Sequence, residues 1–405
     1  MTHDDDITMR LDQLGLTQSD KQSLAMTIRI EAGALTQAAQ YVKERGCRTV
    51  LLAVDDRTYE AAGRRLEQLL AAAGTAPALC AIRPLATGDV VADETSVVQL
   101  LLEAQRSQAE LILAVGGGTI HDLVRYVAYT THVPFLSIPT AASVDGFTSL
   151  GAPLLIRGHK LTIPAARPVA LFADLDILTR APQELAAAGF GDMLGKYTSL
   201  FDWRFGSWTS GEAYLAPAAE LTRQALEDCI RHTEAIRRRD ETGIAMLMRS
   251  LVESGLAMRL FGQSHPASGA EHHLSHYWEL AHLRAGKRQL LHGAKVGAAT
   301  VEISRLYRRL IEDGWYDDAS TGRPELQRHR PEIGRAVRAI PEPAGLQELL
   351  RQVGAPAAPS ELGLENGLIQ ASLREAHLIR PERATLLRLY NESNMKERIQ
   401  NDDGR

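Results

Sequence analysis

Residues 111–122 read LILAVGGGTIHD, in which an apolar run leads into three glycines and then into a plausible helix start. Five apolar residues in a row are typical of a buried strand in a parallel sheet. Glycines after such a strand let the backbone approach a pyrophosphate, and the free N–H groups of the helix start attract its charge. Because the pattern is GGG rather than GxGxxG, a tight strand–helix turn without a ligand is the alternative interpretation.

Short apolar runs alternate with longer amphipathic stretches around this turn, from about residue 35 to 180. This alternation predicts an α/β domain over residues 1–180, with a parallel, Rossmann-like sheet that binds a dinucleotide. The expected strands are 49–56, 77–82, 111–115 and 132–140, and the expected helices are 57–74, which ends at the stop signal Gly74, and 93–108.

After Pro182 the chain becomes rich in Ala and Leu with helical spacing, and β-branched runs almost disappear. We therefore expect residues 181–405 to form an all-helical domain, with the active-site cleft between the two domains. A stretch around 317–343 that contains Pro and Arg is expected to be a long connection. The expected helices are 182–203, 213–239, 242–262, 270–284, 290–312, 344–352 and short helices within 364–390.

The composition is that of an ordinary soluble protein, with 405 residues, 45% hydrophobic residues and a net charge of -5. This charge gives no reason to expect a nucleic-acid partner. Cys47, Cys80 and Cys229 are odd in number and lack CxxC spacing, so neither a disulfide framework nor a thiolate metal site is expected. The acidic start MTHDDD is no signal peptide, and no apolar run approaches a membrane span, so we expect a cytoplasmic protein.

Two further segments follow expected strands and offer polar groups. Asp55 and Asp56 end the first strand, where a carboxylate can bind ribose hydroxyls, although a solvated strand end is the simpler explanation. The loop IPTAASVDGFTS (138–149) is made of small residues that let a flat ring or a small polyol approach the backbone.

Three separated segments carry groups suited to one divalent metal ion. They are Asp192 in GFGDMLGK, His272 and His276 in GAEHHLSHYWEL, and His292 in LLHGAKVG. His272 and His276 share a helix face because they are four residues apart, whereas His273 points elsewhere and is interpreted as structural. A single histidine is usually a packed or surface residue. Three ligands of this kind suit zinc, nickel or iron(II) and leave a coordination position open for substrate oxygens.

Five motifs in order closely resemble the bacterial type of glycerol-1-phosphate dehydrogenase. They are GGGTIHD, PTAASVDGFTS, AGFGDMLGKYTSLFDW, SGAEHHLSH and LHGAKVG, and the resemblance covers roughly residues 45–300. That group belongs to the superfamily of glycerol dehydrogenase, iron-type alcohol dehydrogenases and dehydroquinate synthase. Arg125 stands where superfamily relatives with GGGSxxDxxK have Lys, and no role is carried over to it. Asp192 stands where dehydroquinate synthases use Glu, which counts against that reaction.

The resemblance implies roles for individual residues. Asp192, His272 and His292 would be the metal ligands, with Asp192 also among the catalytic residues. His276 would hydrogen-bond substrate, and Asp145 would bind its hydroxyls. Asp55 or Asp56 would face the ribose. The remaining cofactor-binding residues would be Gly116, Gly117, Gly118, Thr119, Ile120, His121 and Asp122 along the pyrophosphate, and Thr140, Ala141, Ala142, Ser143 and Ser149 at the nicotinamide end.

The expected reaction is the reversible reduction of dihydroxyacetone phosphate to sn-glycerol 1-phosphate. The expected cofactors are NADH or NADPH and one divalent metal ion, nickel or zinc, and the expected assembly is a homodimer. Alternatives are a dehydrogenase of unphosphorylated glycerol or another polyol, a lyase of the dehydroquinate-synthase type, and a non-enzymatic metal or nucleotide sensor. A phosphorylated substrate needs cationic partners, for which Lys160, Lys196, Lys287 and Lys295 are the candidates.

Overall fold

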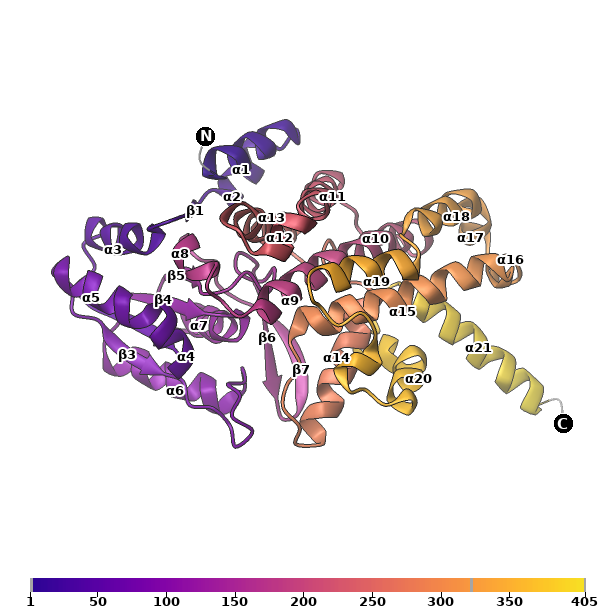
Figure 1. The fold of residues 1–405 in the computed structure, drawn as a ribbon. Coiled ribbons are helices and arrows are strands. Elements are labelled where there is room, and N and C mark those ends of the chain that lie inside the picture. Colours follow the sequence, from indigo (N-terminus) through magenta and orange to yellow (C-terminus); the bar gives the residue numbers. More distant parts are fainter. Residues whose placement is uncertain (1–2, 321–322, 404–405) are drawn as a thin grey trace.

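The computed structural model describes residues 3–320 and 323–403, with side chains described for 7–317 and 323–394. A six-stranded parallel sheet forms the first half of the molecule (Figure 1). Helical crossover connections join the parallel strands, so the order of the strands in the sheet, β1-β8-β5-β4-β2-β3, differs from their order in the sequence. The strands are β1 Thr27–Glu31, β2 Val50–Val54, β3 Ala78–Ala81, β4 Leu111–Gly116, β5 Phe135–Pro139 and β8 Ala170–Asp174.

Helices cover both faces of the sheet, as the alternation of the sequence predicted. Alternate residues of a strand point to opposite faces. Leu52 of β2 therefore packs in the same core as Leu66 of α5, whereas Leu51 packs in the core that contains Leu100 of α6. The covering helices are α3 Ala34–Glu44, α4 Asp56–Thr58, the π-helical turn η1 Tyr59–Gly63, α5 Arg64–Ala72, α6 Glu94–Arg106 and α7 Gly118–Thr131.

All four expected strands are present, but the sequence prediction missed β1, β8 and a hairpin. The hairpin joins β6 Gly151–Ile156 to β7 His159–Pro164 in antiparallel pairing. Its two turn residues, Arg157 and Gly158, both have positive φ, at 51° and 77°. This is the requirement of the two-residue turns that match the twist of a hairpin.

The second half of the chain is helical, as expected, and packs beside the sheet (Figure 1). The expectation of a long connection around 317–343 was wrong, because α17 and α18 occupy most of it. Each of these two helices has one proline within its first two positions. The backbone N–H that proline lacks would have no partner inside the helix there, so its absence costs nothing. The helices are α8 Leu175–Leu178, α9 Gln183–Leu194, α10 Lys196–Thr209, α11 Ala216–Arg231, α12 Thr233–Arg238, α13 Glu241–Phe261, α14 Ala270–Arg284, α15 His292–Glu312, α16 Trp315–Ser320, α17 Pro324–Arg328, α18 Arg330–Ala339, α19 Pro343–Gln352, η2 Pro359–Leu362, α20 Asn366–Glu375, η3 Ala376–Ile379 and α21 Leu386–Asp403.

The first two helices, α1 His3–Gln13 and α2 Gln18–Leu24, lie against the helical half (Figure 1). Arg10 of α1 pairs with Asp228 of α11 and, at 2.7 Å, with Glu253 of α13. We propose a boundary between two domains near residue 180, shortly after β8, with α1 and α2 attached to the second. Among the helices of the described residues, none has the length and apolar character needed to cross a membrane.

Candidate metal centre

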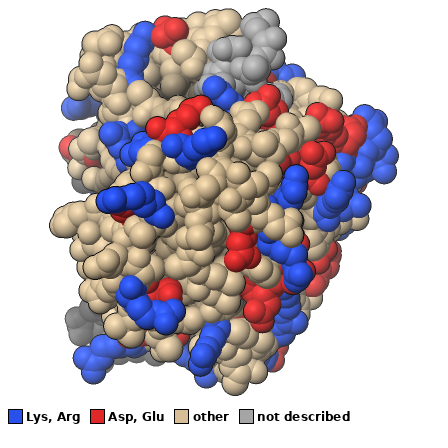
Figure 2. Space-filling view, turned by 90° about the vertical axis from the view of Figure 1, so that its left-hand side faces the viewer, with Lys and Arg blue, Asp and Glu red and all other residues tan. Residues whose placement is uncertain are grey.

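A cavity of about 1730 Å³ lies between the carboxyl ends of the strands and the helical half. Its lining comes from both halves and includes Gly117 after β4, Thr140 after β5, and His272 and His292. In open parallel sheets, the crevice beyond the carboxyl ends of the strands is where ligands bind. The charged side chains on the outer face shown in Figure 2 are of both signs and interspersed, so that face carries no block of a single charge.

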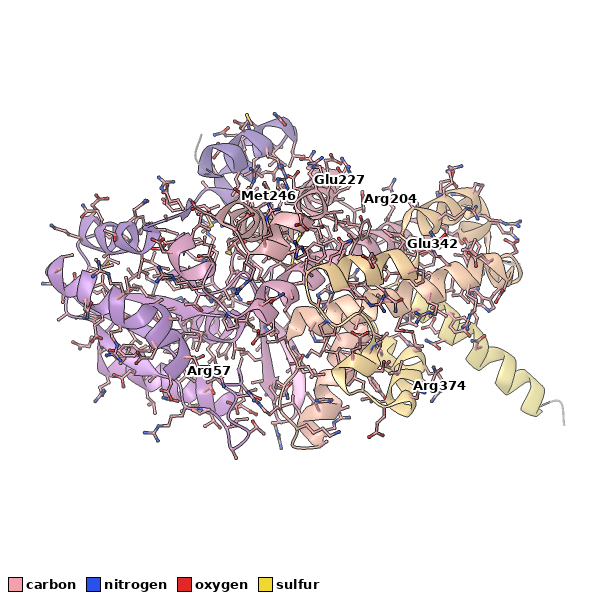
Figure 3. All side chains as sticks on the ribbon, viewed as in Figure 1. Arg57, Arg204, Glu227, Met246, Glu342 and Arg374 are labelled. Carbon is pink, nitrogen blue, oxygen red and sulfur yellow. The ribbon has the colours of Figure 1, made fainter. Side chains whose placement is uncertain are left out.

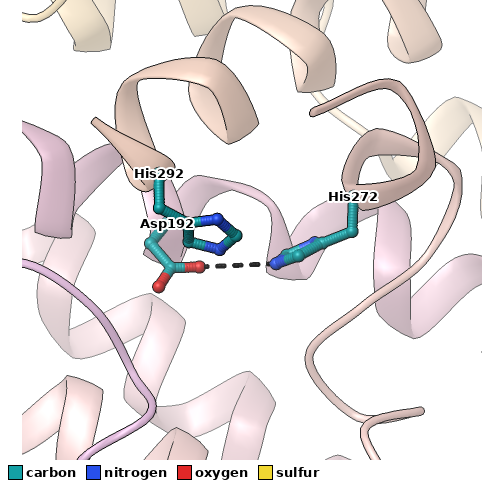
Figure 4. Close-up of side chains that lie close together, drawn as sticks. All are labelled: Asp192, His272 and His292. Atoms are coloured by element: carbon teal, nitrogen blue, oxygen red, sulfur yellow. Dashed lines mark ion pairs between the residues drawn. The ribbon is translucent and has the colours of Figure 1, made fainter. Parts of the chain in front are cut away.

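Asp192, His272 and His292 converge at the wall of this cavity, which the two histidines line while Asp192 is fully buried beside them (Figure 4). One ligand atom from each lies within 4.8 Å of the other two, and His272 Nε2 is 3.8 Å from Asp192 Oδ1. Burial, reinforced by nearby His272 and Lys160, holds the pKa of His292 well below its usual range. A neutral imidazole is the form that binds metal, so this donor set fits a divalent cation such as zinc or nickel.

Glycines explain how α9 and α15 bring Asp192 and His292 together. A Cβ on Gly191 would lie 2.4 Å from the carbonyl oxygen of Gly293, and a Cβ on Gly297 would lie 3.1 Å from the Cα of Gly191. Only glycine allows the two backbones to approach this closely. Asp192 directly follows Gly191 in GFGD, and His292 directly precedes Gly293 in LHGAKVG. Each candidate ligand is therefore next to a glycine whose close contact sets the spacing of the two helices.

Glu271 orients His272, and the sequence analysis missed it. Its Oε1 lies 2.7 Å from His272 Nδ1, which leaves Nε2 directed at Asp192. Burial alone would raise the pKa of Glu271, but hydrogen bonds from His272 and from the Thr198 hydroxyl hold it below its usual value. A carboxylate behind a histidine ligand fixes its tautomer and orientation. Its position directly before His272 was the available signal.

Lys196 lies between the carboxylates of Asp145 and Asp192. Its Nζ is 2.7 Å from Asp145 Oδ2, 3.0 Å from Asp192 Oδ1 and 3.2 Å from the carbonyl oxygen of Ala267. Burial opposes protonation, but the two carboxylates outweigh it and raise the pKa of the ammonium group. All three N–H donors thus have protein acceptors, which leaves none for a substrate phosphate.

His276 and His273 occupy different environments, as their positions on the helix predicted. The His276 ring lies 6.2 Å from that of His272 and 6.0 Å from that of His292, and it lines the cavity. Its nitrogens are not within the metal-ligand group found among the described residues. His273 is fully buried and does not line the cavity, and burial holds its pKa well below its usual value.

The glycine turn combines tight packing with an open side. A Cβ on Gly116 would lie 2.8 Å from Ile120, and one on Gly118 would lie 3.0 Å from Val144. Gly117 has nothing within 4 Å and lies at the N-terminus of α7, facing the cavity. Tight packing therefore accounts for Gly116 and Gly118, whereas Gly117 is open to the cavity and its contact with a pyrophosphate stays a prediction.

Not every residue that the resemblance assigned to the cofactor lines the cavity. His121 is fully buried, 2.9 Å from both the carbonyl oxygen of Gly117 and the Ser137 hydroxyl. Ala142 lies beneath its loop, where its carbonyl oxygen would be 2.0 Å from a Cβ on Gly189. Gly116 is also buried and does not line the cavity. The residues assigned to the cofactor that line the cavity are Asp55, Asp56, Gly117, Gly118, Thr119, Ile120, Asp122, Thr140, Ala141, Ser143 and Ser149, and Asp145, assigned to the substrate, lines it as well.

Asp55 and Asp56 differ in their contacts. Asp55 caps α4, accepting a hydrogen bond of 2.8 Å from the backbone N–H of Thr58, and Thr58 accepts one in return from the N–H of Asp55. Asp56 is exposed at the edge of the cavity. The first carboxylate therefore has a structural task, and the second is available to a ligand.

Arg125, which stands where superfamily relatives have Lys, connects α7 to the loop that follows β5. Its guanidinium donates to Asp122 at 2.7 Å, to the carbonyl oxygen of Gly151 at 3.0 Å and to that of Gly146. Burial raises the pKa of Asp122 to about 7, although Arg125 opposes the shift. Arg125 therefore links α7 to the start of the hairpin.

The fold first defines a class, since it is that of the iron-type alcohol dehydrogenases. A model of the family "Iron-containing alcohol dehydrogenase" matches residues 29–182. The structure is similar to that of glycerol dehydrogenase from Schizosaccharomyces pombe, with a TM-score of 0.64, 18% identity and coverage of 91% of this chain and 85% of that one.

Sequence relatives narrow the class to one family. The chain is 43% identical to glycerol-1-phosphate dehydrogenase [NAD(P)+] of Geobacillus stearothermophilus over 371 residues, covering 89% of this chain and 90% of that protein. It is also 43% identical to the enzyme of that name from Bacillus subtilis, covering 87% and 88%. The chain belongs to the glycerol-1-phosphate dehydrogenase family.

Proposed function

We propose that this protein is a metal-dependent sn-glycerol-1-phosphate dehydrogenase that reduces dihydroxyacetone phosphate with NADH or NADPH. The observation that supports the proposal is the convergence of Asp192, His272 and His292 at the wall of a cavity that Gly117 and Gly118 of the glycine turn also line. Relatives at 43% identity over about nine-tenths of the chain bear that name. We also propose that the enzyme acts as a cytoplasmic homodimer; the exposed apolar residues Val98 and Leu102, one turn apart on α6, support self-association.

Asp192, His272 and His292 would hold the metal, which we propose to be nickel or zinc, with Glu271 keeping His272 in the ligating orientation. When bound, the cation supplies Lewis acidity at a carbonyl oxygen and the reduced nicotinamide supplies a hydride. Lys196 places its ammonium group between the adjoining carboxylates of Asp192 and Asp145 and pairs with both.

His276 and Asp145 would bind the hydroxyl groups of the triose. Burial, with a contribution from Lys160, holds the pKa of His276 well below its usual value, so the ring is neutral and can donate or accept a hydrogen bond. Asp145 is fixed by Lys196 and by the Ser254 hydroxyl, which donates to its Oδ2 at 2.9 Å. A carboxylate held in one orientation can select the position of a substrate hydroxyl.

The nucleotide would lie across the carboxyl ends of the strands, with its pyrophosphate at Gly117 and the start of α7. We propose that Asp56 rather than Asp55 binds the adenine ribose, because the carboxylate of Asp55 already caps α4. Thr140, Ser143 and Ser149 line the other end of the cavity and would flank the nicotinamide.

The test is a coupled assay on the purified protein after removal of its metal and reloading with nickel, zinc or iron(II). NADH and NADPH oxidation are compared with dihydroxyacetone phosphate and with dihydroxyacetone, and the configuration of the product is determined. The expected result is metal-dependent oxidation that favours the phosphorylated ketone and yields sn-glycerol 1-phosphate. A preference for dihydroxyacetone would instead support a polyol dehydrogenase, and turnover without net NADH consumption would support a lyase.

A further inference from the structure

The cations around the metal centre differ in how far they are already neutralised. Lys196 is committed to three protein oxygens, and Lys295 donates to Glu279 at 2.9 Å. Arg383 lies 3.8 Å from Glu212 and donates to the carbonyl oxygen of Ser268. Lys287 is exposed and does not line the cavity. Most of the cations that the sequence offered for a phosphate are therefore unsuitable or already paired.

Arg380, directly after η3, is different. Its Nη1 donates to the Ser264 hydroxyl at 2.8 Å and its Nη2 to the Thr162 hydroxyl at 3.1 Å. Both partners are neutral, and no carboxylate of the described residues lies within 4.0 Å of its nitrogens. Arg380 is half-buried where it lines the cavity, and this burial lowers the pKa of its guanidinium group. Because a desolvated charge without a counter-ion is costly, an anion in the cavity would stabilise it.

A second cation, Lys160 on the β6–β7 hairpin, lies near Arg380. Lys160 and Thr162 are two residues apart on β7 and so lie on the same face of the strand. Lys160 shares Glu279 with Lys295, at 2.7 Å and 2.9 Å, so this triad keeps one positive charge. Together with Arg380, the three cations and one carboxylate carry a net charge of about +2, which matches a phosphate dianion.

These cations also lie next to the metal centre. Glu279, which Lys160 and Lys295 share, lies 3.7 Å from His276 Nδ1, and the His276 ring is 6.2 Å from the ring of His272. Lys160, His276 and Arg380 line the same cavity. A phosphate attached one carbon from the ketone needs a site within a few ångströms of the metal. The other anion that the cavity would hold, the nucleotide pyrophosphate, has its own place at Gly117.

We propose that Arg380, with Lys160 beside it, forms the subsite that binds the phosphate of the triose and so sets the preference for a phosphorylated substrate. The inference rests on the proposed function, which names the substrate. It assigns specificity to the segment after α20, outside the motifs that carry the chemistry. Two hydroxyls hold the guanidinium, and its remaining N–H donors are left for phosphate oxygens.

The test compares Arg380→Gln and Arg380→Lys with Arg374→Gln in the metal-loaded enzyme. Arg374 is an exposed arginine of the same segment that projects outward from α20 (Figure 3). Two quantities are measured: the Kd for inorganic phosphate, by calorimetry without nicotinamide, and the KM for dihydroxyacetone phosphate, dihydroxyacetone and NADH. Loss of a charge-assisted contact predicts a rise of about ten- to hundredfold in the phosphate Kd and in the KM for dihydroxyacetone phosphate.

Arg380→Lys should recover part of this loss, and the kinetics with dihydroxyacetone, the KM for NADH and the Arg374→Gln variant should stay unchanged. If the wild type prefers dihydroxyacetone phosphate and Arg380→Gln keeps its affinity for that substrate and for phosphate, the subsite is wrong and the proposed function stands. A rise in the KM for NADH alone would assign Arg380 to the nucleotide and overturn the inference. If the wild type neither reduces dihydroxyacetone phosphate nor binds phosphate, the proposed function fails as well.

Discussion

Gly293 lies so close to Ala188 that a Cβ on Gly293 would be 1.8 Å from the carbonyl oxygen of Ala188. Two rigid backbones meet there, so neither can yield as a flexible side chain would. Gly293→Ala should push α15 away from α9 and separate His292 from Asp192. We expect a loss of about 1–3 kcal/mol or more in the free energy of unfolding, together with weaker metal retention. Chemical denaturation and metal analysis after dialysis would measure both effects.

The matched control is Gly345→Ala in α19, where a Cβ would have nothing within 4 Å. There the substitution should leave metal content unchanged and stabilise the helix by up to about 1 kcal/mol. Equal behaviour of the two variants would show that helix spacing does not set the geometry of the ligands.

Removal of a ligand should empty the metal site without unfolding the protein. His272→Ala and His292→Ala each take away one of the three proposed ligands, so we expect sub-stoichiometric metal in the purified protein and a fall in kcat of at least about a hundredfold. Inductively coupled plasma mass spectrometry gives the metal content. His159→Ala is the control, since His159 is exposed on the hairpin outside the cavity. Full activity of a metal-free variant would refute the assignment.

Replacement of Lys196 should make the protein's stability depend on metal. Lys196→Met leaves Asp145 and Asp192 buried without their shared cation, which we expect to cost about 3–5 kcal/mol in the metal-free protein. A divalent ion at Asp192 replaces part of that charge. Thermal melts with and without added zinc should therefore show a larger zinc-induced rise in Tm for the variant than for the wild type. An unchanged difference would mean that Lys196 does not compensate these carboxylates.

The buried His121 should make the fold sensitive to acid. Burial lowers the pKa of His121 to about 3, below the 6.5 of a free imidazole. Between these values the unfolded chain binds the extra proton, so the stability that His121 contributes is complete above about pH 6.5 and is lost as the pH falls toward 3. Each such imidazole removes up to about 1.4 kcal/mol per pH unit.

Urea titrations from pH 7 to pH 5 would measure this slope, which His121→Gln should reduce. His159→Gln, at an exposed position, should leave it unchanged. A variant at His121 with the wild-type slope would place the acid sensitivity elsewhere.

Asp55 and Asp56 should respond differently to substitution. Asp55→Ala removes the cap of α4 and should lower the free energy of unfolding by about 1 kcal/mol. Asp56→Ala should instead raise the KM for NADH more than the KM for NADPH, because it removes both a ribose acceptor and a charge that repels a 2′-phosphate. Steady-state kinetics with both nucleotides separate the effects. A shift of cofactor preference in Asp55→Ala alone would reverse the assignment.

The sequence predicted the parts of the fold that have a strong period. Runs such as TVLLAVDD and LILAV identify strands that are buried on both faces, and the helical half follows from its Ala/Leu spacing. It did not reveal β1, whose TIRIE alternates in burial, or the hairpin, whose β7 is largely exposed. Around 317–343, the Pro-containing sequence predicts a connection, whereas its prolines stand in the first turns of α17 and α18.

In the site, the sequence identified residues that carry recognisable chemistry and missed those that orient them. The Asp192, His272 and His292 side chains meet in one place, whereas Lys196, expected as a phosphate candidate, lies between two carboxylates. Arg380 gave no signal, because its place beside β7 depends on a contact across 218 residues. Tertiary contacts of this kind leave no local period in a sequence.

The β6–β7 hairpin belongs by sequence to the sheet half, yet two polar residues of β7 contact the helical half. Lys160 pairs with Glu279, and Thr162 accepts a hydrogen bond from Arg380. Any hinge motion that parts the two halves must break both links at once. The hairpin thus joins the two halves through the same groups that we propose to meet the anion, so binding of that anion would alter the contacts that hold the cleft together.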